Sequence, residues 1–146
     1  MKSMKITSVL FLLIFSISIK SNAQNTITTV KMHKVVMQLN SADTSAWSGV
    51  IGNIRNFQKI WPEQVQIEVV VHGKAIDFLL KEKSHLKEDI LKLTSDKIQF
   101  VACENTMRKH NITKEMLIEK VGTVPSGVAE LILKQEENWG YLKTGF

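Results

Sequence analysis

Short runs of apolar and β-branched residues recur along the chain and predict the strands of a sheet. The two strongest, Val65–Val71 and Lys97–Ala102, are mostly apolar, which is typical of parallel strands that are buried on both faces. The run His33–Asn40 precedes them, and a weaker run, Glu119–Val124, follows them and stops before a proline. The tail Trp139–Lys143 is a candidate for a short additional edge strand.

Between these runs, apolar residues recur at spacings of three and four, which predicts helices. The clearest pattern follows Asp43 and Thr44, either of which is able to cap a helix. Similar patterns follow Ser84, Thr113 and Ser126. The apolar positions concerned are Trp47, Val50, Ile51, Ile54 and Phe57, then Leu86, Ile90 and Leu93, then Leu117 and Val121, and finally Val128, Leu131 and Ile132.

The links between the first three predicted strands, residues 41–64 and 72–96, are far longer than a hairpin needs. Links of this length suit helical crossovers between parallel strands. A chain of 146 residues has room for one core of ordinary size. The pattern therefore predicts a single small α/β domain with four or five mostly parallel strands and helices on both faces.

The amino-terminal segment has the pattern of a secretory signal peptide. Lys2 and Lys5 precede a mainly apolar run, Ile6–Ile19, which is shorter than the roughly 20 residues that a membrane-spanning helix needs. Small residues then offer a cleavage site after Ala23. The alternative is an uncleaved membrane anchor. We expect cleavage before Gln24 and an exported protein that is periplasmic or secreted and has no membrane attachment once cleaved.

This prediction divides the chain into a signal peptide at residues 1–23, a polar lead at 24–32 and the α/β domain at 33–146. Cleavage removes Lys2, Lys5 and Lys20 and no acidic residue, which lowers the net charge from +5 to +2. Such a small charge, spread along the chain, argues against nucleic-acid binding, because that function needs a clustered basic face.

The composition excludes several other kinds of site. A single cysteine rules out an intrachain disulfide and a cysteine-cluster zinc site. No second histidine lies at metal-ligand spacing from His72, and neither a glycine-rich phosphate loop nor a GxSxG motif is present. We therefore expect no metal and no cofactor.

The reactive residues fall where the predicted strands end. Because the carboxyl ends of parallel strands share one edge of the sheet, ligands of such folds bind there. Polar residues and glycines are also ordinary at these positions, where they cap helices. The candidates for a pocket are Asn40, Ser41, His72, Gly73, Asn105, Pro125 and Ser126, and the candidate for a catalytic residue is Cys103.

Cys103 ends the third predicted strand and begins a predicted helical turn that runs through Met107. Unpaired backbone N–H groups at the start of a helix favour a thiolate, which is the nucleophilic form of cysteine. Arg108 and Lys109 add positive potential one turn later, whereas Glu104 opposes it. The alternative is a core residue, since cysteine packs like a small apolar side chain.

His72 is a candidate general base or substrate-contacting group, because imidazole titrates near neutral pH. Gly73 beside it allows the backbone to turn tightly or to approach a ligand. The alternative is a strand-end histidine that is paired with a backbone carbonyl.

Taken in order, five segments resemble the DsrE/DsrF-like sulfur-relay family over nearly all of residues 33–146. They are Val35–Asn40, Val69–Gly73, Phe100–Met107, Val124–Glu130 and Gln135–Tyr141. The resemblance implies a compact α/β fold that assembles into trimers or higher rings. For members that act in sulfur transfer, it also implies a persulfide on a cysteine at the position of Cys103.

We therefore expect a sulfur carrier, or sulfurtransferase-like protein, that passes sulfur from Cys103 to a partner thiol. The alternative is a non-catalytic, oligomeric module that binds a small ligand, with Cys103 as a wall of its pocket. The residues alone leave open whether the chain is an enzyme. Large aromatics, which are enriched in subunit contacts, also favour a homo-oligomer; they are Trp47, Trp61, Trp139 and Tyr141. The resemblance implies that this oligomer is a trimer or a multiple of it.

Overall fold

A five-stranded, all-parallel sheet forms the centre of the computed structural model, which describes residues 31–95 and 97–145. The strands lie in the order β4-β3-β2-β1-β5. Their bounds are β1 His33–Leu39, β2 Val65–Val71, β3 Ile98–Cys103, β4 Gly122–Val124 and β5 Gly140–Thr144. This confirms the predicted fold class. The predicted signal peptide and the start of the polar lead lie outside the described residues.

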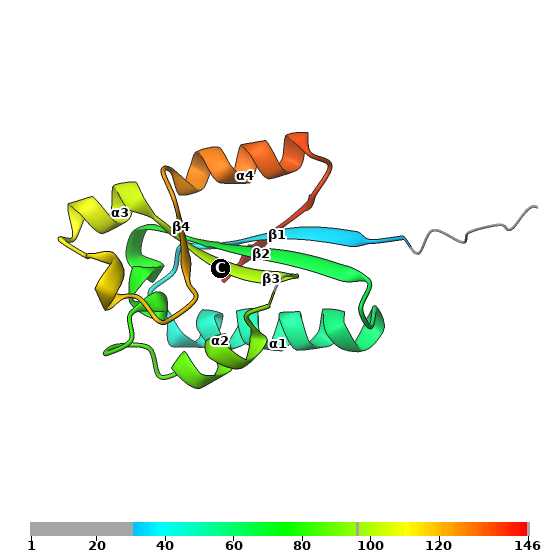
Figure 1. Cartoon of the computed structure of the whole chain (residues 1–146), viewed down its shortest axis with the longest axis horizontal. Helices are drawn as coiled ribbons and strands as arrows, with labels where there is room; N and C mark the ends of the chain where they lie inside the picture. The colour runs from blue at the N-terminus through cyan, green and yellow to red at the C-terminus, as the bar shows by residue number, and fades with distance from the viewer. Residues whose placement is uncertain (1–30, 96, 146) are drawn as a thin grey trace, which may run out of the picture.

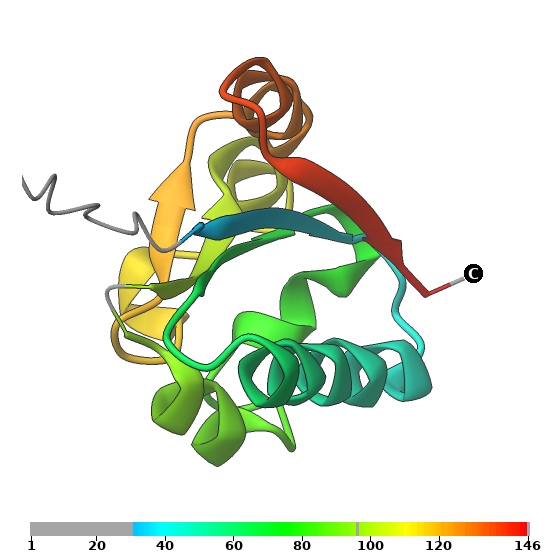
Figure 2. The same ribbon diagram turned by 90° about the vertical axis from the view of Figure 1, so that its right-hand side faces the viewer.

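Helices cover both faces of the sheet, with α1 and α2 on one side and α4 on the other (Figures 1 and 2). The short helix α3 lies at the carboxyl edge of the strands, directly after β3. The helical elements are α1 Thr44–Ile60, η1 Gly73–Leu79, α2 Lys87–Leu93, α3 Glu104–Lys109, η2 Lys114–Met116 and α4 Gly127–Glu136. The sequence pattern did not predict η1, a 3-10 helix that follows β2.

The main core lies between the sheet and the layer formed by α1, η1 and α2. Asp43 caps the start of α1, and its carboxylate accepts a hydrogen bond from the Ser45 N–H at 2.8 Å. The helix buries the apolar face that its spacing predicts, including Trp47 and Ile54. Fully burying side chains of this size contributes roughly 1.5–3 kcal/mol each, so this layer supplies most of the hydrophobic stabilisation.

The core beneath α4 is smaller. It consists of Val36, Val70, Val101, Val124, Leu131 and Trp139. Only Gly127 and Leu131 of α4 are buried, whereas the aliphatic side chains of Val128, Ile132 and Leu133 are exposed. The outward side of this helix is therefore unusually apolar.

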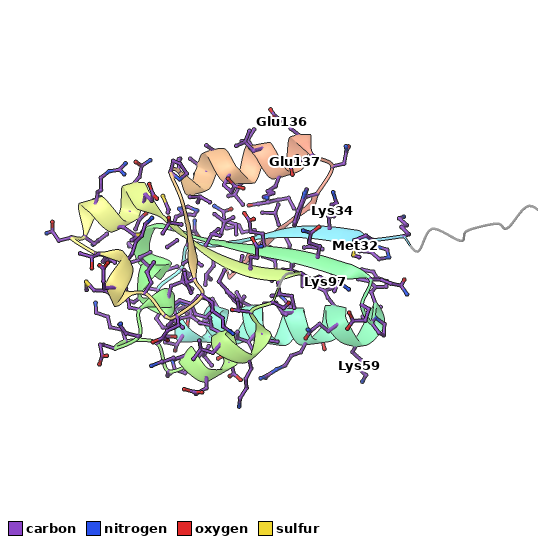
Figure 3. The ribbon with its side chains drawn as sticks, viewed as in Figure 1. Met32, Lys34, Lys59, Lys97, Glu136 and Glu137 are labelled. Carbon is purple, nitrogen blue, oxygen red and sulfur yellow. The ribbon has the colours of Figure 1, made fainter. Side chains whose placement is uncertain are left out.

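A buried acid lies beneath α4. Glu68 of β2 is 5% exposed, and its Oε2 lies 3.1 Å from the Lys134 Nζ. The same ammonium group lies 3.4 Å from Glu130 and 4.7 Å from the centre of the Trp139 ring. Figure 3 shows the labelled Lys34 on this side of the sheet as well, and its Nζ lies 5.8 Å from the centre of the Trp139 ring.

The prediction of a helix after Thr113 is wrong. Only η2 forms there, and the following residues join the main core in an extended conformation. Leu117 makes an antiparallel bridge with Leu80, and the Ile118 N–H donates to the Leu79 carbonyl at 2.9 Å. Both side chains gain burial against the chain that follows η1, and this tertiary contact overrides the helical spacing.

Within residues 31–95 and 97–145, no helix is long and apolar enough to cross a membrane.

Candidate functional site

Cys103 is the last residue of β3 and occupies the N-cap position of α3. The residue is 5% exposed. It lies against the first turn of α4, because a Cβ placed on Gly127 would be 3.3 Å from the Cys103 Cβ. The starts of α3 and α4 therefore meet at one sulfur atom.

Backbone donors face this sulfur from both helices. They are the N–H groups of Gly127 in α4 and of Thr106 and Asn105 in α3. The Cys103 side chain makes no capping hydrogen bond with α3, as expected of a neutral thiol, whose sulfur is a weak acceptor. An ionised sulfur is a much stronger acceptor and gains most from such donors.

The balance of effects at Cys103 favours the thiolate. Burial by itself raises the pKa of the Cys103 thiol, because low polarity disfavours the charged form. Donation from the backbone N–H groups and from the Thr106 hydroxyl outweighs this effect and holds the pKa below its ordinary value. The sulfur therefore has the electrostatic environment of a reactive cysteine.

Thr106 connects Cys103 to the turn after β2. Its Oγ1 accepts a hydrogen bond from the Gly73 N–H at 3.0 Å, which leaves its own proton free to point at the sulfur. Gly73 has a φ of +59°, a left-handed conformation that glycine adopts without a steric penalty. The turn at Gly73 thus orients a backbone donor toward the side chain that supports Cys103.

His72 lies on the same side of the sheet. Its Cβ would lie 3.2 Å from a Cβ on Gly127, which also touches Cys103. The ring is half-buried, and burial lowers the pKa of His72 below its ordinary value. Its Nε2 lies 2.8 Å from the side-chain nitrogen of Gln38.

The other candidates lie farther from the sulfur or play a different part. Asn40 is exposed, and Ser41 supports the start of α1, where its carbonyl accepts from the Trp47 indole at 2.9 Å. The Asn105 side chain accepts from Arg108, so only its backbone faces the sulfur.

Pro125 is exposed, and Ser126 occupies the N-cap position of α4 without a side-chain capping bond.

Two surface hollows lie at the opposite, amino-terminal edge of the sheet. One includes Lys97 and the other Lys120, and neither reaches Cys103. Among the residues that the structure describes, no cluster of histidine, cysteine and acidic side chains is able to hold a metal ion.

Three functional residues were missed in the sequence. Thr106 and Gly127 carried weak signals: Thr106 is the third residue after Cys103, and Gly127 is a glycine at the start of a predicted helix. The sequence signal at Gln38 was clearer, because a polar amide stands there between the apolar residues Met37 and Leu39 of a predicted strand.

The chain belongs to the DsrE/DsrF-like family, whose model matches residues 15–144. This class of small α/β proteins is generally related to sulfur relay. The assignment agrees with the resemblance found in the sequence.

Solved structures share the fold. A protein of unknown function, MTH1491 from Methanobacterium thermoautotrophicum, is 32% identical with a TM-score of 0.72, over 76% of this chain and 98% of that chain. The ychN protein from E. coli is 15% identical with a TM-score of 0.62, over 77% of this chain and 99% of that one. A conserved protein of unknown function, BT1422 from Bacteroides thetaiotaomicron, is 11% identical with a TM-score of 0.61, over 75% of this chain and 93% of that one. No curated protein matches the sequence.

Proposed function

We propose that the protein is a sulfur carrier that holds a persulfide on Cys103. The observation that carries this proposal is the convergence of two helix starts on one sulfur, which lowers the pKa of the Cys103 thiol despite burial. A thiolate is the form that attacks the outer sulfur of a persulfide or polysulfide. Membership of a family related to sulfur relay supports the same chemistry.

The transfer needs no external oxidant or reductant. The Cys103 thiolate attacks the terminal sulfur of a donor persulfide, a new S–S bond forms, and the S–S bond of the donor breaks. The donor leaves as a thiolate, while the terminal sulfur keeps its proton. In the second step a partner thiolate attacks this terminal sulfur, and Cys103 leaves as the thiolate. The donors that lower the pKa of Cys103 also stabilise it as a leaving group.

Intact-protein mass spectrometry tests this proposal. The protein is incubated with inorganic polysulfide or with thiosulfate, freed of reagent and weighed. We expect a gain of one sulfur atom that dithiothreitol reverses, and no gain in Cys103→Ser. An unchanged mass with both donors would contradict the carrier and would favour the alternative, a non-catalytic module that binds a small ligand.

We propose that the functional unit is a homo-oligomer, a trimer or a multiple of it. Trp47 and Trp139, two of the aromatics that suggested subunit contacts, are buried within the chain itself. The support now comes from the outer side of α4, where Val128, Ile132 and Leu133 are 60, 56 and 51% exposed. Exposed apolar side chains gathered on one helix are typical of interaction sites in soluble proteins.

We also propose export of the protein, with the mature chain beginning at Gln24. The support is the charged start, the short apolar run and the small residues before the cleavage point. Amino-terminal sequencing of protein isolated from its native host is expected to begin at Gln24. A chain that retains Met1 would contradict cleavage.

A further inference from the structure

Three polar side chains form a row across the face of the sheet that carries α4. Tyr141 of β5 pairs with Val36 of β1, and Gln38 pairs with Val70 of β2. Because alternate residues of a strand share a face, Tyr141, Gln38 and His72 follow one another diagonally toward the carboxyl edge. The Tyr141 hydroxyl donates to the side-chain oxygen of Gln38, and the side-chain nitrogen of Gln38 lies 2.8 Å from the His72 Nε2.

The direction of these hydrogen bonds assigns the state of the imidazole. An amide nitrogen only donates, so the His72 Nε2 must accept. An accepting Nε2 carries no proton, and the ring is then neutral with its proton on Nδ1. In the orientation observed for Gln38, the amide oxygen accepts from the Tyr141 hydroxyl and the amide nitrogen faces His72.

The surroundings of His72 suit a neutral ring. Burial is the effect that lowers the pKa of His72, with no contribution from a charged side chain among the described residues. Its nearest neighbours include Gly127 and, through that glycine, Val70 and Cys103. Among the residues that the structure describes, no acidic side chain raises the pKa of His72 toward an imidazolium.

We propose that Gln38, oriented by Tyr141, is a positioning residue that holds His72 as the neutral Nδ1–H tautomer beside Cys103. In this arrangement the only lone pair of the imidazole is occupied by Gln38. His72 is therefore unable to take the proton of Cys103, and it offers an N–H donor in place of a base. The thiolate then depends on the backbone N–H groups of α3 and α4 rather than on an ion pair with His72.

The significance of this state for sulfur transfer rests on the proposed function, but the state itself does not. Long-range proton–nitrogen NMR correlation of the imidazole distinguishes the two tautomers without any sulfur chemistry. The chain has four histidines, so the His72 signals are assigned by their loss in His72→Ala. We expect the wild-type protein to show an unprotonated Nε2 and a protonated Nδ1 above the pKa of His72.

A near-isosteric change at Gln38 provides the decisive variant. In Gln38→Glu the new carboxylate only accepts, so Nε2 must carry the proton, the tautomer reverses and the pKa of His72 rises. In Gln38→Leu and in Tyr141→Phe the preference weakens toward a mixture. A wild-type ring with its proton on Nε2 would overturn the proposal, and so would an unchanged tautomer in both Gln38→Glu and Gln38→Leu.

The same protein samples separate this proposal from the carrier function. Sulfur uptake by Cys103 is measured in parallel by mass spectrometry. A protein that shows the expected tautomer but takes up no sulfur refutes the carrier and leaves the role of Gln38 standing. A protein that takes up sulfur but has the opposite tautomer refutes the role of Gln38 alone.

Discussion

The backbone N–H of Gly73 donates to the Thr106 hydroxyl at 3.0 Å and thereby joins the end of β2 to the helix that follows β3. This one hydroxyl therefore accepts from one strand end and supports the sulfur of another. The contact explains how two segments that are distant in the sequence act on the same thiol.

Removal of the Thr106 hydroxyl should raise the pKa of Cys103. In Thr106→Val the sulfur loses a donor, and the Gly73 N–H loses its acceptor, which costs about 1–2 kcal/mol of stability. The ultraviolet absorbance of the thiolate measures the pKa directly, because Cys103 is the only cysteine, with Cys103→Ser as the blank. Thr106→Ser keeps the hydroxyl and should keep the low pKa. An equal rise in both variants would show that the hydroxyl is not the cause.

A side chain at Gly127 should separate α4 from the sulfur. The Cβ of Gly127→Ala would lie 3.2 Å from His72 and Val70 and 3.3 Å from Cys103, so the first turn of α4 must shift. We expect a higher pKa for Cys103, because the N–H of residue 127 moves away, and a loss of about 1–3 kcal/mol from overpacking.

Gly52 of α1 is the matched control for this change. Apart from the adjacent residues and the backbone of the helix itself, no described atom lies within 4 Å of a Cβ at that position. Gly52→Ala should stabilise the helix by about 0.5–1 kcal/mol and leave the pKa of Cys103 unchanged. Urea unfolding and the thiolate titration measure both quantities. If the pKa of Cys103 in Gly127→Ala stayed as low as in the wild type, the role assigned to the start of α4 would be contradicted.

Loss of the Lys134 charge should destabilise the protein at neutral pH. Burial raises the pKa of Glu68 even in the wild type, despite its contact with Lys134. In Lys134→Met the Glu68 carboxylate loses the cation that contacts it, which costs about 3 kcal/mol. The double variant Glu68→Gln with Lys134→Met should recover most of this loss.

The pH dependence of the Lys134→Met variant follows from the direction of the shift. An acid whose pKa is higher in the folded state favours folding when it is protonated. The variant should therefore be nearly as stable as wild type below the unfolded pKa of Glu68, and it should lose stability as the pH rises through the folded pKa. Urea unfolding at acidic and neutral pH checks this. A loss of equal size at both pH values would show that Glu68 remains uncharged or that packing dominates.

An acidic residue on the outer side of α4 should disrupt self-association. Light scattering of the mature protein should give a mass of at least three chains, and Ile132→Asp should lower it. Ile60 at the end of α1 is 64% exposed on the other side of the sheet, so Ile60→Asp is the control and should leave the mass unchanged. A wild-type monomer at micromolar concentration would contradict the oligomer, and a mass lowered only by Ile60→Asp would place the contact elsewhere.

The fold was predictable because its strands are apolar runs separated by long links. The bounds predicted for β2, Val65–Val71, agree with the structure, since both faces of this central strand are buried. The prediction of a helix after Thr113 was wrong, because the spacing of Leu117 and Val121 also suits an extended chain. Its conformation depends on contact with Leu80, which lies too far along the sequence for a local pattern to reveal.

The sequence was sufficient to predict which edge of the sheet carries the candidate site. His72, Gly73 and Cys103 end neighbouring parallel strands, so topology alone brings them together. The supporting contacts of Gln38 and Gly127 depend on the register between strands and on how closely α4 approaches the sheet. These are tertiary quantities, and a single sequence contains only their residue types.

The last helix and strand also determine when the domain is complete. β5 pairs with β1, so this contact joins two strands that are separated by nearly the whole sequence of the domain. Contacts between such distant segments form late in folding, because the ordering of the intervening chain has to come first. On the ribosome, β3 and its cysteine emerge before Gly127 does. A growing chain therefore lacks one of the donors that activate the sulfur, and full thiol reactivity arises only in the finished domain.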